Sequence, residues 1–146
     1  MGKKLHPSVE LAWVRLVRAE RSVVEGVEAE VIAQDLPPLA WYDVLLELSR
    51  RPDRRLRQGN LQAKMLFAQY NLSRLLDRLE RAGLVRREAC PTDARSKWVV
   101  ATPEGIALRE RVWPSYAAAI ERHLGSKLTP EEAATLAALL GKLIGR

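Results

Sequence analysis

The sequence predicts a mainly α-helical fold that carries one small β-hairpin wing. A short helical segment at residues 60–66 is followed by a strongly amphipathic one at residues 68–83, and then by two strand-like runs around a polar turn at residues 84–101. Long helical stretches flank this region on both sides. A helix pair followed by a two-stranded hairpin is the order of elements in a winged helix-turn-helix core.

The segment at residues 68–83 has two chemically different sides. Leu72, Leu75, Leu76 and Leu79 recur at the spacing of one helix face, and Gly83 is the residue type favoured just past a helix end. The other side and its flanks hold groups that can hydrogen-bond base edges and phosphates, namely Tyr70, Ser73, Arg74, Asp77, Arg78 and Arg81. This pattern suits a recognition helix, although an ordinary amphipathic helix with a solvated charged face would show it too.

Two strands joined by a polar turn are predicted after the amphipathic helix. Val85 in residues 84–89, and Trp98, Val99 and Val100 in residues 97–101, suit strands, and residues 91–96 between them suit a turn. The turn carries Arg95. A hairpin that projects an arginine can insert it into a DNA minor groove.

The helix and hairpin together resemble the MarR family of bacterial transcription regulators. That family has a serine and an arginine in the recognition helix, a D-R-L-E helix end, G-L-V-x-R, a D-x-R wing and L-T-x-x-G before the next helix. The chain matches this pattern at Ser73, Arg74, Asp77 to Glu80, Gly83 to Val85, Arg87, Asp93, Arg95, Thr102 and Gly105. It departs from the pattern at Ala94 and Ala101. The resemblance implies a homodimer in which each wing and recognition helix meets one half of a palindromic DNA site.

Positive charge is concentrated in the same region. The formal net charge of the chain is +6. Residues 50–100 hold 13 Lys and Arg and 5 Asp and Glu, a balance of +8, whereas the rest of the chain holds 11 basic and 13 acidic residues, a balance of −2. A basic concentration on the predicted winged helix favours a nucleic-acid partner. The arginines of residues 50–57 fit a solvated connection and a set of phosphate contacts equally well.

The flanking helices are more apolar than one short chain can cover. Residues 8–34 form a long helical stretch with apolar residues on more than one face. Residues 103–123 form another, which Pro114 is expected to bend, and Thr129 to Glu132 is a capping box before a leucine-striped last helix. A second copy of the chain is the expected cover. We therefore expect one domain over residues 1–146, with a winged-helix DNA-binding core at 36–102 and dimerisation helices at 1–35 and 103–146.

The predicted DNA contacts follow from this arrangement. Base readout is assigned to Gln69, Tyr70, Asn71, Ser73 and Arg74. Phosphate contacts, which would make binding strongly salt-dependent, are assigned to Lys64, Arg78, Arg86, Arg87 and Lys97. Arg95 is assigned to the minor groove, and Asp93 is expected to brace the wing by pairing with an arginine.

An effector pocket is expected by resemblance, because regulators of this family often bind small aromatic acids or phenolic compounds where the dimerisation helices meet the winged core. The candidate lining residues are Trp13, Arg15, Trp41, Tyr42 and Trp113. An arginine there could hold a carboxylate. The commoner role of large aromatic side chains is simply to fill a core, and this alternative stays open.

The chain lacks the residue patterns of catalytic and metal sites. His6 and His123 lie at opposite ends of the sequence, and no metal-binding, phosphate-loop or nucleophile motif occurs. We expect no enzyme activity, no cofactor and no metal. One cysteine, no signal peptide and no apolar run of membrane-spanning length predict a cytoplasmic, nucleoid-associated protein without a membrane partner. That cysteine, Cys90, has arginines nearby that could lower its pKa, but a small residue in a strand is the simpler interpretation.

These patterns predict a sequence-specific, double-stranded DNA-binding transcription regulator, most simply a ligand-responsive repressor that binds a palindromic operator as a homodimer. One alternative is a sequence-neutral, nucleoid-associated DNA-binding protein, which only a specificity ratio would separate from a repressor. Another is a winged helix whose basic face meets an acidic protein, and the arginine at the wing argues against it.

Overall fold

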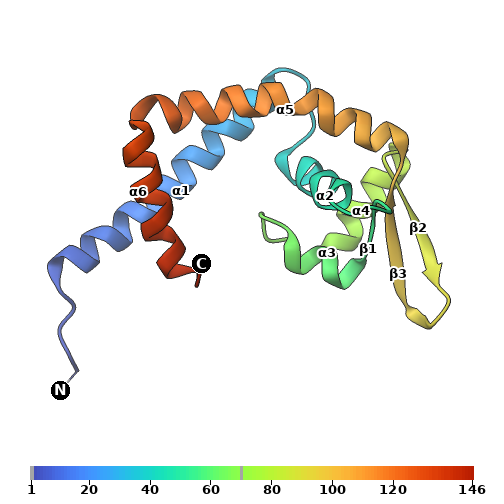
Figure 1. The fold of residues 1–146 in the computed structure, drawn as a ribbon, viewed down its shortest axis with the longest axis horizontal. Helices are drawn as coiled ribbons and strands as arrows, with labels where there is room; N and C mark the ends of the chain where they lie inside the picture. Colours follow the sequence, from blue (N-terminus) through green and yellow to red (C-terminus); the bar gives the residue numbers. More distant parts are fainter. Residues whose placement is uncertain (1, 70) are drawn as a thin grey trace. The chain divides into compact units, whose positions relative to one another are not determined.

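A computed structural model describes residues 2–69 and 71–146, without the side chains of Ala94 and Arg95. The described residues form a mostly helical chain with one small sheet, which confirms the predicted fold class. The helices are α1 (Pro7–Ala33), α2 (Leu39–Ser49), α3 (Gln58–Lys64), α4 (Leu72–Arg81), α5 (Pro103–His123), the short 3-10 helix η1 (Gly125–Lys127) and α6 (Pro130–Leu143), and the strands are β1 (Arg55–Arg57), β2 (Val85–Cys90) and β3 (Asp93–Ala101) (Figure 1). They group into two compact units: Asp35–Pro114, called the winged unit, and Met1–Gln34 with Ser115–Arg146, called the helical unit.

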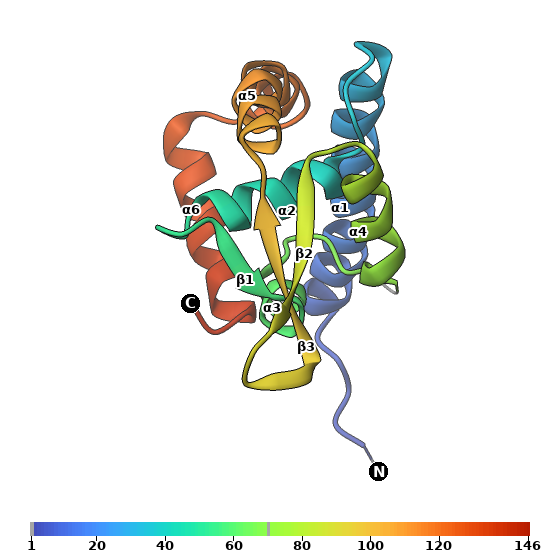
Figure 2. The same ribbon diagram turned by 90° about the vertical axis from the view of Figure 1, so that its right-hand side faces the viewer.

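The sheet of the winged unit has three antiparallel strands in the order β1-β3-β2 (Figure 2). β2 and β3 form the predicted hairpin. The sequence does not predict β1, because residues 50–57 are expected only to connect two helices. β1 joins the sheet through Leu56, which pairs with Val99, and both side chains are buried, whereas Arg55 and Arg57 on either side of Leu56 are half-buried.

The amphipathic helix α4 begins at Leu72, four residues later than predicted. Asn71 has a non-helical backbone with φ −139°, and its side-chain oxygen accepts a hydrogen bond from the Arg74 amide at 3.0 Å. The asparagine therefore caps the helix by satisfying an amide that has no partner within the helix. Gln69 and Asn71 lie before the helix rather than in it, and Tyr70 lies outside the described residues.

The other end of α4 is a Schellman motif at the predicted glycine. Gly83 has φ +76°, its amide donates to the Glu80 carbonyl at 2.9 Å, and the Leu84 amide donates to the Leu79 carbonyl at 3.0 Å. The first turn of α5 packs on this corner. A Cβ atom at Gly105 would lie 2.2 Å from the Leu84 carbonyl oxygen, so only glycine allows this approach.

The core of the winged unit lies between its helices and its sheet. The predicted leucine stripe of α4 is buried, together with Leu39, Val44, Leu45 and Leu48 of α2, Leu61 of α3, and Leu56, Val85 and Val99 of the sheet. Because α4 turns its leucines inward, its polar side chains face outward. Cys90 ends β2 as a buried strand residue, and its sulfur lies 3.3 Å from the Thr92 hydroxyl.

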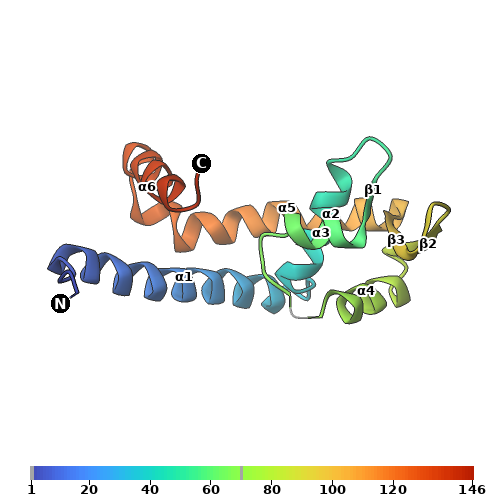
Figure 3. The ribbon, with the colours of Figure 1, turned by 90° about the horizontal axis from the view of Figure 1, so that it is seen from below.

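In the helical unit, α1 and the C-terminal part of α5 lie side by side (Figures 1 and 3). The Arg122 guanidinium donates to the Glu30 carboxylate at 2.8 Å, and His123 Nε2 lies 3.2 Å from the same carboxylate. The hydrogen bond from Arg122 holds the pKa of Glu30 below its usual value. Gly26 lets the His123 ring approach α1, since an added Cβ would lie 2.5 Å from that ring.

The last helix, α6, is capped as predicted but buries none of its residues. The Thr129 amide donates to the Glu132 carboxylate at 2.9 Å, and the Glu132 amide donates to the Thr129 hydroxyl at 3.1 Å. A single chain leaves many apolar side chains of this unit exposed, namely Leu5, Val9, Leu11, Trp13, Leu16 and Val17 near or on α1, and Leu136, Leu139, Leu143 and Ile144 on or after α6.

Candidate DNA interface

The outward side of α4 carries exposed hydrogen-bonding groups. Ser73 and Arg74 lie in its first turn and Arg78 one turn further on, and all three are exposed. Hydroxyl and guanidinium groups are among the side chains that bind base edges and phosphates in the DNA major groove. The surface of α4 thus has the composition of a recognition helix, and its leucine face fixes which side is presented.

A cluster of ion pairs connects α4 to strand β2. The Arg87 guanidinium donates to Asp77 and, at 3.0 Å, to Glu80, and the Arg87 amide donates to Glu80 at 2.9 Å. These hydrogen bonds hold the pKa of Glu80 below its usual value. Partial burial acts to lower the pKa of Arg87, but the hydrogen bonds to Asp77 and Glu80 outweigh burial and raise it. The arginine is therefore fully charged and held between the helix and the wing.

This cluster gives Arg87 a structural role that the sequence does not predict, beside its predicted phosphate contact. Its side chain is only 18% exposed, and two carboxylates of α4 already bind it. The neighbouring Arg86 is exposed and forms a surface ion pair with Glu88 at 2.9 Å. Arg87 thus braces the wing against α4, and the phosphate contacts expected of Arg86 and Arg87 stay predictions.

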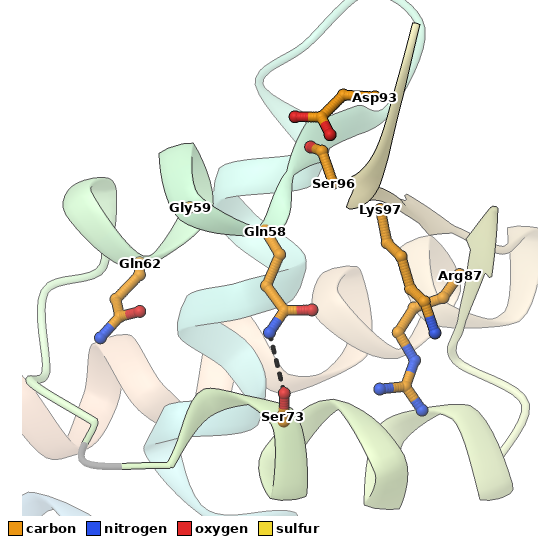
Figure 4. Close-up of a pocket in the computed structure, with 8 residues that line it drawn as sticks. All are labelled: Gln58, Gly59, Gln62, Ser73, Arg87, Asp93, Ser96 and Lys97. Atoms are coloured by element: carbon orange, nitrogen blue, oxygen red, sulfur yellow. Dashed lines mark hydrogen bonds between the residues drawn. The ribbon is translucent and has the colours of Figure 1, made fainter. Parts of the chain in front are cut away.

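A polar cleft of about 450 Å³ lies between α3, α4 and the wing (Figure 4). Its lining consists of Gln58, Gly59 and Gln62 from α3, Ser73 from α4, Arg87 from β2, and Asp93, Ser96 and Lys97 from β3. The Gln58 side-chain amide donates to the Ser73 hydroxyl at 2.9 Å. Ser73, Arg87 and Lys97 are predicted DNA contacts that the fold brings to one cleft. Gln58 and Gln62 are not predicted, because a glutamine in a short helix carries no motif.

A buried carboxylate, which the sequence does not predict, forms a hydrogen bond with the connection between α3 and α4. Asp43 of α2 is 3% exposed, and it accepts a hydrogen bond from the Phe67 amide at 2.9 Å. Burial raises the pKa of Asp43 above its usual value, while the hydrogen bonds from Phe67 and Leu66 oppose this increase. An acidic residue within an otherwise apolar helix segment is the signal that could have pointed to it.

The arginines of the unpredicted strand β1 lie against a wing tryptophan. The guanidinium carbons of Arg55 and Arg57 are 4.3 and 5.2 Å from the centre of the Trp98 ring. Arg55 also forms ion pairs with Asp53 at 3.1 Å and with Glu88 at 3.9 Å. These two arginines are therefore part of the sheet surface. The sequence leaves two interpretations open for residues 50–57, a solvated connection and a set of phosphate contacts. Neither of them includes this structural role.

The remaining predicted DNA contacts are only partly described. Lys64 is the exposed last residue of α3, and Asp93 begins β3. The side chain of Arg95 and the whole of Tyr70 lie outside the described residues. Bracing of the wing by Asp93 and insertion of Arg95 into a minor groove therefore stay predictions.

Two of the five predicted effector residues are brought together within the winged unit. The rings of Tyr42 and Trp113 stack with their centres 6.1 Å apart and an interplanar angle of 19°. Burial raises the pKa of Tyr42, and the charge and hydrogen bond of Arg109 oppose this increase. The Nε atom of Arg109 is buried and has no hydrogen-bond partner among the described residues. Trp41 is half-buried on α2, whereas the exposed Trp13 and Arg15 belong to the helical unit.

A polar recognition helix braced against a basic hairpin defines a winged helix-turn-helix DNA-binding protein, and comparison with known proteins agrees. Residues 34–96 match the model of the MarR family. The HTH-type transcriptional regulator MhqR of Bacillus subtilis (strain 168) is 32% identical over 120 residues, which are 82% of this chain and 80% of that protein. The chain belongs to the MarR family, and it is a DNA-binding transcription regulator rather than an enzyme.

Solved structures share the fold over nearly the whole chain. Sco3205, a MarR family transcriptional regulator from Streptomyces coelicolor solved in complex with DNA, has a TM-score of 0.86 at 27% identity, and the match covers 99% of this chain and 90% of that one. Bordetella bronchiseptica BpsR, whose DNA binding is regulated by 6-hydroxynicotinic acid, has a TM-score of 0.79 with 99% of both chains covered. At 23% identity, the likeness to BpsR concerns the fold alone.

Two further observations concern membranes and metals. Among the described residues, no helix combines the length and the apolar composition that crossing a bilayer requires. Within the same residues, no group of three His, Cys, Asp or Glu side chains is placed to hold a metal ion.

Proposed function

We propose that the protein is a sequence-specific repressor that binds a palindromic operator as a homodimer and releases it when a small effector binds. The observation that carries specific binding is the exposed polar side of α4, which Arg87 ties to the wing. A recognition helix and a wing held in one geometry suit base readout, because hydrogen bonds to base edges need precisely placed groups. The +8 balance of residues 50–100 would add non-specific attraction to phosphates.

The homodimer is supported by the uncovered apolar surface of the helical unit. Trp13 on α1 and Leu139 and Leu143 on α6 are each more than half exposed in a single chain. Exposed apolar residues gathered on a few helices are typical of a protein–protein interface. A second copy is the favoured partner, because a symmetric dimer would offer two recognition helices to two half-sites.

The effector proposal is supported by the aromatic stack and the arginine in the winged unit. Tyr42 and Trp113 offer flat apolar surfaces, and the Arg109 Nε donor has no partner among the described residues. A planar aromatic acid would complement both features. The regulation of BpsR by 6-hydroxynicotinic acid suggests that compound as a first probe. It should quench tryptophan fluorescence and release DNA from the protein, and both effects should weaken in an Arg109→Gln variant.

The experiment that tests binding to a specific site is fluorescence anisotropy at about 150 mM salt, where non-specific dissociation constants are typically about 10⁻⁴–10⁻⁶ M. The probes are the intergenic DNA upstream of the protein's own gene and a scrambled duplex of equal length. A preference of about a thousand-fold for the native DNA is the expected result for an autoregulating repressor.

The second candidate function is sequence-neutral DNA binding, favoured by the concentration of basic residues alone. It predicts equal, weak and strongly salt-dependent binding to both duplexes. Equal binding would also fit a regulator of distant sites. Selection from random DNA then separates these two cases, since only a specific regulator enriches a sequence.

A further inference from the structure

The hydrogen bond between Gln58 and Ser73 joins the first residue of α3 to the recognition helix across the polar cleft (Figure 4). Gln58 is half-buried, and it directly follows β1, whose pairing with β3 fixes the backbone on its N-terminal side. Ser73 is exposed and is the second residue of α4. A fixed amide thus contacts the hydroxyl that the winged-helix geometry offers to DNA.

The chemistry of this contact determines what Ser73 can do next. A serine hydroxyl has one hydrogen to donate and two lone pairs that accept, whereas the nitrogen of a glutamine amide only donates. Because Gln58 donates at 2.9 Å, the Ser73 hydrogen must point elsewhere. Among the described residues, no acceptor receives that hydrogen, so it is free for a partner outside the protein.

We propose that Gln58 is a specificity-determining residue, which orients the Ser73 hydroxyl so that it donates to an acceptor on a base edge of DNA. The major-groove acceptors of this class are N7 and O6 of guanine, N7 of adenine and O4 of thymine. Gln58 occupies one of the two lone pairs of the hydroxyl, so the hydrogen and one lone pair remain to face DNA. Without Gln58, no hydrogen bond among the described residues would hold the hydroxyl in that orientation. This inference rests on the proposed function, since it requires α4 to meet DNA.

Gln62 provides a matched comparison within the same cleft. It is the same residue type on the same helix, but its side-chain amide lies 3.5 Å from the Gln69 carbonyl, and the hydrogen bond to Ser73 comes from Gln58 instead. A general effect of removing a glutamine from this cleft should therefore appear in both variants. An effect transmitted through Ser73 should appear only at Gln58.

The test is a set of double-mutant cycles on DNA affinity, measured by fluorescence anisotropy. Gln58→Ala, Gln58→Glu and Ser73→Ala are made singly and as doubles with Ser73→Ala, and Gln62→Ala and Gln62→Glu serve as controls. The glutamate variants keep the side-chain shape and remove the donor, and Gln62→Glu corrects for the added charge. Thermal unfolding checks that each variant is folded. The duplex is the sequence that the wild-type protein selects from random DNA, together with its single base-pair variants.

We expect Ser73→Ala to weaken binding about three- to tenfold, the size of one net hydrogen bond. Gln58→Ala should weaken binding comparably when Ser73 is present and have no further effect in the Ser73→Ala background. A loss confined to one base-pair position would identify a base-edge acceptor and support the proposal. A uniform loss over all sequences would identify a phosphate oxygen and would overturn the role of Gln58 in specificity.

Independent, additive losses from Gln58 and Ser73 would overturn the inference, as would a Gln58→Glu variant that behaves like Gln62→Glu. Failure of the proposed function would look different, because the wild-type protein would then select no sequence. Selection of one sequence by the wild-type protein, together with additive losses from Gln58 and Ser73, would overturn the inference alone.

Discussion

Arg86 and Arg87 are adjacent in β2, and the alternation of a strand sends their side chains to opposite faces of the sheet. Arg87 faces α4 and is bound by Asp77 and Glu80, whereas Arg86 shares the other face with Glu88. An ion pair that is partly buried and made of several hydrogen bonds contributes more to stability than an exposed one. The two arginines should therefore respond differently to removal.

We expect Arg87→Ala to lower the free energy of unfolding by about 1–2 kcal/mol, a value reduced from that of a buried pair because both carboxylates are partly exposed. It should also weaken DNA binding by loosening the wing, without changing how steeply affinity depends on salt. Arg86→Ala should leave stability nearly unchanged and reduce the salt slope by about one phosphate contact. Urea unfolding and anisotropy at several salt concentrations measure both. A reduced slope in Arg87→Ala with unchanged stability would restore Arg87 as a phosphate contact.

At Asp43, hydrogen bonding and titration can be separated by two substitutions. Asp43→Ala leaves the Phe67 amide without its acceptor and should cost about 1–3 kcal/mol, whereas Asp43→Asn keeps an acceptor oxygen and removes a buried charge. Because burial raises the pKa of Asp43, the folded wild-type chain holds the proton more tightly than the unfolded chain. Its stability therefore rises as pH falls through that raised value, and the asparagine variant lacks this gain.

The stability of Asp43→Asn relative to the wild type should consequently be greatest at neutral pH and decline towards acid. Urea unfolding between about pH 4 and pH 7 covers this range. A constant difference over that interval would mean that Asp43 does not titrate with folding. Equal stability of the alanine and asparagine variants would mean that the hydrogen bond to Phe67 does not contribute to stability.

At the scale of elements, the corner where α4, β2 and α5 meet depends on one glycine. Gly105→Ala would place a Cβ 2.2 Å from the Leu84 carbonyl oxygen, and overpacking of this kind should cost about 1–3 kcal/mol. Gly59→Ala is the matched control, because Gly59 lies in α3 with no atom near its position for a Cβ. That variant should be unchanged or more stable by up to about 1 kcal/mol. Thermal unfolding of the two variants checks the prediction, and equal melting temperatures would contradict it.

Elements that depend on neighbouring residues are predictable from this sequence. The leucine spacing of α4, the glycine that ends it and the capping box of α6 are all confirmed, because each is a local pattern. β1 is missed because a three-residue run with two arginines looks like a solvated connection. Its strand conformation depends on pairing with β3, which is distant in sequence. Asn71 is a missed local signal, since asparagine is favoured at helix caps.

In the candidate site, too, local patterns are predictable from the sequence and contacts between distant residues are not. Ser73, Arg74 and Arg78 are predictable because the leucine stripe determines which face of α4 is exposed. The partners of Arg87 and Ser73 are not, because Asp77, Glu80 and Gln58 meet them only after the helices and the sheet have packed. The type of residue at a site could thus be predicted, but not whether it faces DNA or another part of the protein.

At the scale of the whole molecule, the apolar surface of the helical unit should hold two chains together. Leu139 on α6 is 53% exposed, so Leu139→Glu should leave the fold of the chain intact while it disrupts a dimer. Leu66→Glu is a control in the winged unit, where Leu66 is 74% exposed. Sedimentation velocity should show a monomer only for Leu139→Glu, and operator affinity should fall with the dimer. A stable dimer in that variant would place the interface away from α6.

The central proposal is that the protein binds one DNA sequence as a symmetric dimer, and that α4 and the wing of each chain contact one half-site. Selection of duplexes from a random pool by the wild-type protein, followed by sequencing, tests it most directly. The expected result is enrichment of an inverted repeat whose half-sites are centred about one helical turn, roughly 10 base pairs, apart. A pool that binds but enriches no sequence would contradict it and leave a sequence-neutral DNA-binding protein.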